Sequence, residues 1–263
     1  MEHLRIGLVQ FPRDRQDLEG NVTRMLQMVS GFKAVDMVVL PEDWMGALVV
    51  DLPCYLEVMD RLQEQAYKGN FCLVMGAQYI REAEKIYSRG AVLHPTEGVM
   101  GWVEKQFPSA AIQERQFIQA GRPSQVFQFK GVNFGVVVCV DIMYPELVRH
   151  LALGGAEVIF NPSNVVAGRS NLWERVGSTR AAENTVFVVM ANNAKTSYPD
   201  GRPVEGHSFV AGPDGTVLTN WGSTEGCFTC NLNLDDIRRI RERWKYLSDI
   251  KADLQKVVER FYR

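Results

Sequence analysis

Runs of apolar, strand-forming residues recur through almost the whole chain, and segments with helical periodicity lie between them. The runs are rich in Val, Ile and Phe and are bounded by Gly, Pro, Asn and Asp, which is typical of β-strands. We predict strands at residues 5–11, 37–40, 71–78, 91–93, 100–103, 125–129, 133–140, 158–161, 186–191, 208–211 and 216–219. Helical spacing predicts helices at 21–32, 56–67, 145–153 and 170–184. This alternation predicts an α/β fold.

Two short turns indicate that the sheets are not purely parallel. His94-Pro95-Thr96-Glu97-Gly98 joins two expected strands as a hairpin, and Gly212-Pro213-Asp214-Gly215 does the same later. No low-complexity linker divides the 263 residues, so we predict a single domain over 1–263. We expect its C-terminal part, about 235–263, to be a charged, helical extension.

Composition narrows the classes of function. A net charge of −2 offers no basic excess for nucleic acid. The longest apolar runs, such as 134–140, are too short to span a bilayer, and the N-terminus lacks the pattern of a signal peptide. Five cysteines, an odd number, suit a reducing compartment. We therefore predict a cytoplasmic protein with no nucleic acid or membrane partner.

Cys227 and Cys230 form a Cys-x-x-Cys pair, which invites a zinc or redox interpretation. Their segment alternates like a strand, however, and positions i and i+3 of a strand point to opposite faces. A structural zinc also needs about four ligands, and the chain has no second pair of this kind. We predict no metal site here.

Three expected strands end in residues whose side chains could take part in catalysis, and the first of these strands ends at Glu42. The run Val38-Val39-Leu40-Pro41 leads directly into Glu42, with Trp44 two residues later. A carboxylate set against a core strand is partly desolvated, which raises its pKa and makes it a better base near neutral pH. The alternative is a surface-loop glutamate, the commoner fate of a glutamate.

Lys105 ends the second strand, in Met100-Gly101-Trp102-Val103-Glu104-Lys105. A lysine at a strand end can stabilise negative charge that develops in a transition state. The alternative is an ordinary solvated lysine, and Lys105 alone does not decide between them.

Cys139 ends the third strand, and a helix is expected from Pro145. A cysteine at such an elbow can be activated by a nearby base and cation, because the thiolate is the nucleophile. Backbone N–H groups at the elbow, that of Val140 first, are placed to form an oxyanion hole. The alternative is a buried packing cysteine, which suits Cys54 and Cys72 better.

A histidine base remains open at this point, because cysteine hydrolases often use one. The candidates are His3, His94, His150 and His207. A carboxylate base of raised pKa, with a lysine to offset charge, is a coherent alternative.

Together the three segments resemble the nitrilase superfamily of carbon–nitrogen hydrolases. The order Glu42, Lys105, Cys139 matches the family's triad. The carrying motifs are Leu40-Pro41-Glu42, Lys105 with Glu114, Phe117 and Gly121, and Cys139-Val140-Asp141 with Tyr144-Pro145-Glu146. Further matches are Gly155-Ala156-Glu157-Val158, Asn161-Pro162-Ser163, Trp173, Arg180-Ala181-Ala182-Glu183-Asn184 and Gly206-His207-Ser208. Each motif is weak alone, and their order and spacing make the resemblance specific.

The resemblance implies a four-layer α-β-β-α sandwich that assembles as a homodimer or higher homo-oligomer. It implies Cys139 as nucleophile, Glu42 as general base and Lys105 as the group that stabilises the intermediate. Glu114 would be an auxiliary carboxylate that positions the substrate and Lys105. No metal or organic cofactor is expected, and the partner is a small-molecule substrate.

The sequence also departs from the family. Gln106-Phe107-Pro108 replaces the commoner Lys-x-His-Leu pattern, and about two extra residues separate Lys105 from Glu114. Both changes predict an altered pocket wall. We expect the substrate-binding wall to come from the loops around Trp44, the segment 106–114, Tyr144 and Asn164.

Cys139-Val140-Asp141 resembles the amidases and carbamoylases rather than the true nitrilases, which have Cys-Trp-Glu. We therefore predict a hydrolase of a small amide or N-carbamoyl compound. The alternatives are a nitrilase, acyl transfer to an acceptor other than water, and a binding or assembly scaffold with an idle triad.

Overall fold

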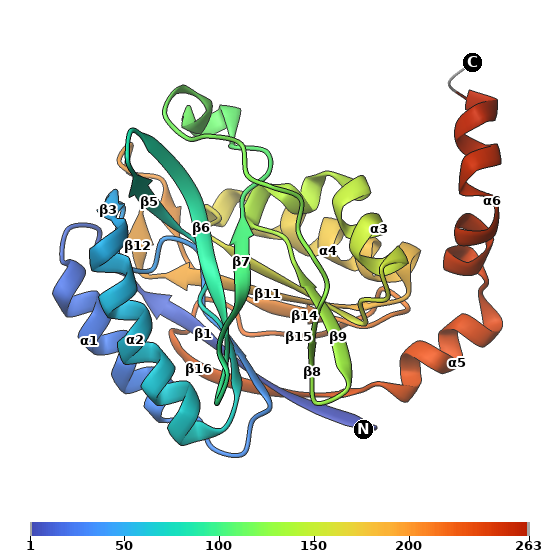
Figure 1. Cartoon of the computed structure of the whole chain (residues 1–263), viewed down its shortest axis with the longest axis horizontal. Coiled ribbons are helices and arrows are strands. Elements are labelled where there is room, and N and C mark those ends of the chain that lie inside the picture. The colour runs from blue at the N-terminus through green and yellow to red at the C-terminus, as the bar shows by residue number, and fades with distance from the viewer. Residues whose placement is uncertain (1, 262–263) are drawn as a thin grey trace.

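The computed structural model describes residues 2–261, and all of its strands except the short hairpin β12–β13 form two joined sheets that lie face to face between pairs of helices (Figure 1). The strands are β1 (His3–Pro12), β2 (Met37–Val39), β3 (Val50–Asp51), β4 (Cys72–Val74), β5 (Gln78–Glu82), β6 (Lys85–His94), β7 (Gly98–Glu104), β8 (Phe127–Phe129), β9 (Val132–Val136), β10 (Val158–Ser163), β11 (Phe187–Ala194), β12 (Thr196–Ser197), β13 (Pro203–Val204), β14 (Phe209–Ala211), β15 (Val217–Asn220) and β16 (Gly226–Asn233).

Helices connect and cover these strands. The α-helices are α1 (Leu18–Ser30), α2 (Leu52–Gly69), α3 (Pro145–Leu153), α4 (Ser170–Asn184), α5 (Asp235–Arg243) and α6 (Tyr246–Phe261). Short 3₁₀ helices are η1 (Ala110–Ile112), η2 (Glu114–Gln116), η3 (Cys139–Met143) and η4 (Ala167–Arg169). The predicted extension over 235–263 begins as helices α5 and α6, and its residues 262–263 lie outside the described residues.

The first sheet has the order β3-β5-β6-β4-β2-β1, with β7 beside β6 and β16 beside β1. The second has the order β11-β10-β9-β8, extended by β14 and β15. The sheets join where the end of β1 pairs with β11, Phe11 opposite Asn193 and Pro12 opposite Ala194. The predicted hairpins β6–β7 and β14–β15 are both present.

Alternation along the strands explains the layers. In β1, Ile6 and Leu8 face the core between the sheets, while Val9 and Phe11 face the core under α1 and α2. Side chains of a strand point alternately to its two faces, so a strand with apolar residues on both is covered on both. Helices α3 and α4 cover the second sheet (Figure 1). The resulting order, helix–sheet–sheet–helix, confirms the predicted sandwich.

Strand direction gathers the chemistry at one edge. Strands β1, β2 and β4 run parallel to one another, as do β9, β10 and β11, and β1 runs parallel to β11. The loops that follow the carboxyl ends of parallel strands therefore meet, which is where α/β proteins place their sites.

Two expected strands differ from the structure. The run 71–78 is broken into β4 and β5, and the run 133–140 stops at Val136. Strand β16 contains the segment around Cys227 and Cys230 that was expected to alternate like a strand, and it pairs along β1 from His3 to Gln10. It carries Cys227 opposite Val9 and Cys230 opposite Ile6.

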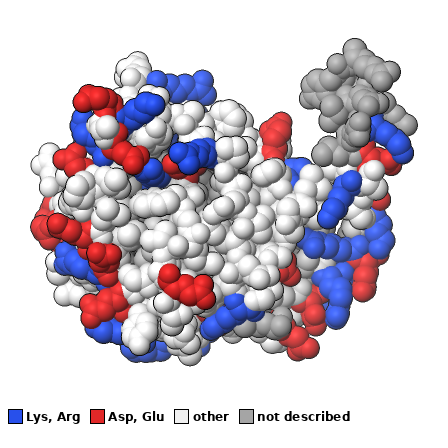
Figure 2. Space-filling view, viewed as in Figure 1, with Lys and Arg blue, Asp and Glu red and all other residues white. Residues whose placement is uncertain are grey.

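Charges of both signs lie side by side on the C-terminal helices, and a broad area without charged side chains occupies the middle of the same face (Figure 2). Among the described residues, no helix has the length and apolarity to cross a membrane. Within the same residues, no cluster of three or more His, Cys, Asp or Glu side chains suits a metal ion.

Candidate active site

The structure brings Glu42, Lys105 and Cys139 to one cavity of about 280 Å³. Glu42 follows β2 and Cys139 follows β9, at the carboxyl ends of parallel strands, whereas Lys105 follows the antiparallel strand β7. All three side chains are almost fully buried. Three strand ends that are far apart in sequence thus deliver a carboxylate, an ammonium group and a thiol to one small space.

Lys105 lies between two carboxylates. Its Nζ is 2.6 Å from Glu42 Oε1 and 2.7 Å from Glu114 Oε1. Burial lowers the pKa of Lys105, but the charges on Glu42 and Glu114 outweigh burial and raise this pKa well above its ordinary value. Lys105 is therefore held as a cation inside the protein, ready to face negative charge that develops nearby.

Glu42 is poised as a base. Burial raises its pKa, and the charge on Lys105 opposes this rise, as does the Cys139 side chain in the same cavity. Asn193 Nδ2 donates to the backbone carbonyl of Glu42 at 2.6 Å, which fixes the loop. A buried carboxylate of raised pKa that shares a cavity with the thiol has the basicity to take its proton.

Cys139 occupies a strained elbow. Its φ of 45° lies in the left-handed region that a non-glycine residue seldom adopts. Asn161 Nδ2 holds the turn by donating to the carbonyls of Val137 at 2.8 Å and Cys139 at 3.2 Å. Burial and the charge on Glu42 raise the pKa of the Cys139 thiol well above its ordinary value. The resting thiol is therefore protonated, and attack needs the base beside it.

Glu114 supports the lysine from behind. It is fully buried, and Tyr79 donates a 2.7 Å hydrogen bond to the same Oε1 that contacts Lys105. The backbone N–H of Ser109 donates to its other oxygen. The segment between Lys105 and Glu114 contains the 3₁₀ turn η1, and its residues Ser109, Ala111 and Ile112 form part of the cavity wall.

Asp141 ties the lysine loop to the cysteine elbow. Its two carboxylate oxygens accept hydrogen bonds from the backbone N–H groups of Gln106 at 2.8 Å and Phe107 at 2.9 Å. Burial raises the pKa of Asp141 to about 6, against the effect of these two hydrogen bonds. The residue two positions after Cys139 therefore fixes the segment that follows Lys105.

The predicted substrate-binding residues divide into two groups. Val140 and Asn164 line the cavity. Trp44 does not, and this expectation is wrong: its indole is buried against Phe11 and donates to the carbonyl of Met75 at 2.8 Å. Tyr144 also lies outside the lining and stacks on Phe107 with ring centroids 4.2 Å apart. It braces the loop rather than the substrate.

Several lining residues escaped prediction from sequence. They are Met143, Val165, Val166, Arg169, Leu172, Trp173, Tyr198 and Arg202. Trp173 stood among the motif matches, while Tyr198 and Arg202 lie on the short β12–β13 hairpin, which carries no local signal of a site. None of the four histidines, all within the described residues, lines the cavity.

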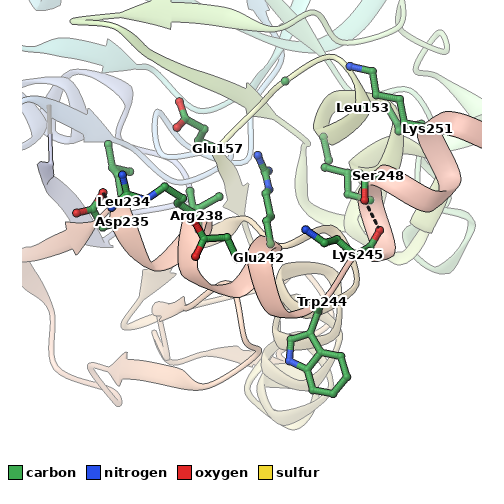
Figure 3. A pocket seen from close by; sticks show the side chains of 15 residues that line it. Leu153, Glu157, Leu234, Asp235, Arg238, Glu242, Trp244, Lys245, Ser248 and Lys251 are labelled. Carbon is green, nitrogen blue, oxygen red and sulfur yellow. Dashed lines mark hydrogen bonds and ion pairs between the residues drawn. The ribbon is translucent and has the colours of Figure 1, made fainter.

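A second, larger cavity of about 640 Å³ lies between the C-terminal helices and the ends of α3 and β10. Figure 3 shows Glu157, Arg238, Glu242 and Lys251 around it. None of the residues Glu42, Lys105 and Cys139 lines it. Its lining has charged side chains of both signs but no cysteine, so the smaller cavity is the candidate active site.

Comparison with known proteins places the chain. Residues 5–242 match the family described as carbon-nitrogen hydrolase. The chain belongs to this family. The resemblance predicted from the motifs is therefore confirmed, and with it the predicted enzyme class, a carbon–nitrogen hydrolase.

Individual relatives are amidases. A 2-oxoglutaramate amidase of Bacillus subtilis is 28% identical over 84% of this chain and 87% of its own length. An N-carbamoylputrescine amidase of Solanum lycopersicum is 28% identical over 71% of this chain and 68% of its own.

Solved structures of the family share the fold. A mutant of the amidase from Nesterenkonia sp. AN1 superposes with a TM-score of 0.82 at 21% identity, over 97% of this chain and 96% of that one. In that protein, the acetamide moiety of fluoroacetamide is covalently attached to the active-site cysteine.

Proposed function

We propose that this chain hydrolyses the C–N bond of a small amide or N-carbamoyl compound through an acyl-enzyme on Cys139. The observation that carries the proposal is that buried Glu42, Lys105 and Cys139 line one cavity, where Glu42 pairs with Lys105 at 2.6 Å. The amidase relatives support the same class of substrate. The cavity of about 280 Å³ suits a small molecule.

The first half-reaction forms the acyl-enzyme. Glu42 takes the thiol proton as Cys139 Sγ attacks the carbonyl carbon of the substrate. Lys105 Nζ and the backbone N–H of Val140 stabilise the oxyanion of the tetrahedral intermediate. Glu42 then gives its proton to the leaving nitrogen, the C–N bond breaks, and ammonia or an amine departs.

The second half-reaction returns the enzyme. Glu42 takes a proton from a water molecule, the resulting hydroxide attacks the thioester carbon, and Lys105 again faces the oxyanion. Collapse of the intermediate breaks the C–S bond and releases the acid product, and the thiolate regains a proton from Glu42. An N-carbamoyl compound follows the same steps through a carbamoyl-enzyme.

Ammonia release from a panel of amides, ureido acids and nitriles tests the proposal, with Cys139→Ala as the catalytic variant and Cys54→Ala as a matched cysteine control. We expect release from amides or ureido acids by the wild type and by Cys54→Ala, and none by Cys139→Ala. Turnover of nitriles alone would favour the nitrilase alternative. No turnover, with Cys139 no more reactive than Cys54 toward iodoacetamide, would favour an idle scaffold.

We also propose a cytoplasmic homo-oligomer. All five cysteines are free, which supports a reducing compartment. The resemblance to the family supports assembly of two or more copies. Light scattering on the purified protein tests this, and a mass of one chain would contradict it.

A further inference from the structure

Resting on the proposed amide hydrolysis, we propose that the substrate carries an anionic group, such as a carboxylate, that Arg169 and Arg202 bind at the rim of the active-site cavity. Both arginines line the same cavity as Cys139. They come from separate segments, η4 and the loop between β12 and β13. We refer to these two residues as the arginine rim.

Arg169 is available for a ligand. It is exposed at the end of η4, directly before α4, and its backbone N–H donates to Val166 at 2.8 Å. Within the described residues, its guanidinium has no hydrogen bond or ion pair to another side chain. An unpaired guanidinium beside a cavity is a strong donor for a carboxylate.

Arg202 is held in place by neighbouring residues but keeps N–H groups free for a ligand. Its guanidinium lies 5.2 Å from the centre of the Tyr198 ring, and Tyr198 also lines the cavity. Its Nε donates to Asp200 Oδ2 at 2.8 Å. A guanidinium has five N–H donors, so the terminal groups remain for a ligand once Nε is engaged. Asp200 does not line the cavity and competes for this cation from outside.

The lining of the active-site cavity has three chemically different parts. Glu42, Lys105 and Cys139 carry the chemistry, and the ammonium of Lys105 compensates Glu42. The apolar lining includes Ile112, Met143, Leu172 and Trp173, which suits a short hydrocarbon segment. Arg169 and Arg202 are then the cations of the lining without a carboxylate partner in the lining itself. A substrate with an amide, a short apolar segment and an anionic end complements these three parts.

The same charges select against other substrates. An amide that ends in an ammonium group would meet two guanidinium groups, and like charges brought together disfavour binding. We therefore expect the order of preference to be anionic, then neutral, then cationic, for amides of equal length.

A matched substrate pair tests the inference: the monoamide of a short dicarboxylic acid and the methyl ester of that monoamide. We expect Arg169→Gln and Arg202→Gln each to lower kcat/KM for the carboxylate about three- to tenfold, mainly through KM, because exposed charge pairs are screened. Both variants should turn over the methyl ester within about twofold of wild type. Arg175→Gln is the control, since Arg175 is an exposed arginine on α4 that does not line the cavity.

Asp200→Asn provides a test in the opposite direction. It keeps an oxygen for the backbone N–H of Arg202, which Asp200 Oδ1 accepts at 3.1 Å, and removes the competing charge. We expect a lower KM for the carboxylate substrate and no change for the ester. Equal effects of the arginine variants on both substrates would overturn the inference while leaving amide hydrolysis intact. No ammonia from either substrate, with no dependence on Cys139, would instead overturn the proposed function.

Discussion

The charged groups in two parts of the active site differ in their exposure to solvent. In the buried centre, formed by Glu42, Lys105, Glu114 and Cys139, the Lys105 side chain is 1% exposed and contacts two carboxylates. At the arginine rim, the Arg202 side chain is 48% exposed and pairs with a carboxylate that is itself 54% exposed. Buried charges interact strongly and shift one another's pKa values, whereas exposed charges are screened. We therefore propose that the centre supplies catalysis and that the rim supplies selectivity of modest strength.

The largest expected effect comes from removing the nucleophile. Cys139→Ala should reduce kcat for ammonia release by roughly 10⁴-fold or more, because no other group can form the acyl-enzyme. Cys72→Ala, a buried cysteine in β4, should change kcat little. Ammonia release measured with a coupled assay decides the point. Comparable rates for the two variants would show that the centre is not the site of chemistry.

Removing the base should cost slightly less. Glu42→Gln keeps the size of the side chain but cannot take a proton, so kcat should fall about 10²- to 10⁴-fold. Glu104→Gln is the matched control, since Glu104 precedes Lys105 but accepts the backbone N–H of Arg122 at 2.8 Å and does not line the cavity. If both variants lost activity equally, the role of Glu42 would be structural.

Glu114 tests whether a buried residue outside the cavity lining affects catalysis through Lys105. Glu114→Gln removes one of the two carboxylate charges that pair with Lys105. A hydrogen bond to a charged group is worth about 1.5–3 kcal/mol, so kcat should fall roughly 10- to 100-fold. The loss should appear in kcat rather than KM, because Glu114 does not line the cavity. A change in KM alone would show instead that Glu114 acts on the substrate.

The smallest effect concerns stability rather than turnover. Asp141 has a pKa of about 6 in the folded protein and 3.8 ordinarily, so between these values the folded state binds more protons than the unfolded chain. Its contribution to the free energy of unfolding therefore falls as pH rises from about 4 to 6, by up to ~3 kcal/mol.

Asp141→Asn removes this titration. The free energy of unfolding from urea titrations should favour wild type over the variant more at about pH 4 than at about pH 7. A difference between the two proteins that does not change with pH would contradict the raised pKa of Asp141.

Glu42, Lys105 and Cys139 could be predicted from sequence, because each comes shortly after a strand that local patterns reveal, whereas Glu114 lies in η2 and was predicted only through the family resemblance. The helices 145–153 and 170–184 have the predicted bounds for the same reason. The break between β4 and β5 does not follow. Gly76 has φ of 77°, and a Cβ there would lie 2.0 Å from the carbonyl of Pro41, so the close approach to the Glu42 loop depends on tertiary contact.

The positions of the arginine rim and of Trp44 could not be predicted from local sequence patterns. Arg169 and Arg202 reach one cavity because the ends of β10 and β11 meet, which no spacing between them signals. Trp44 lies close to Glu42 in sequence, yet the chain turns at Asp43, whose φ is 53°, and the indole packs under α1 and α2. Proximity in sequence does not place a side chain on the same side of the sheet.

Peptide mapping by mass spectrometry, after acid quenching during turnover of a small amide, tests the central claim most directly. The mechanism predicts an acyl group on the peptide that contains Cys139 and unmodified peptides for Cys54, Cys72, Cys227 and Cys230. Turnover with no acyl group on Cys139, or with the acyl group on another cysteine, would contradict it.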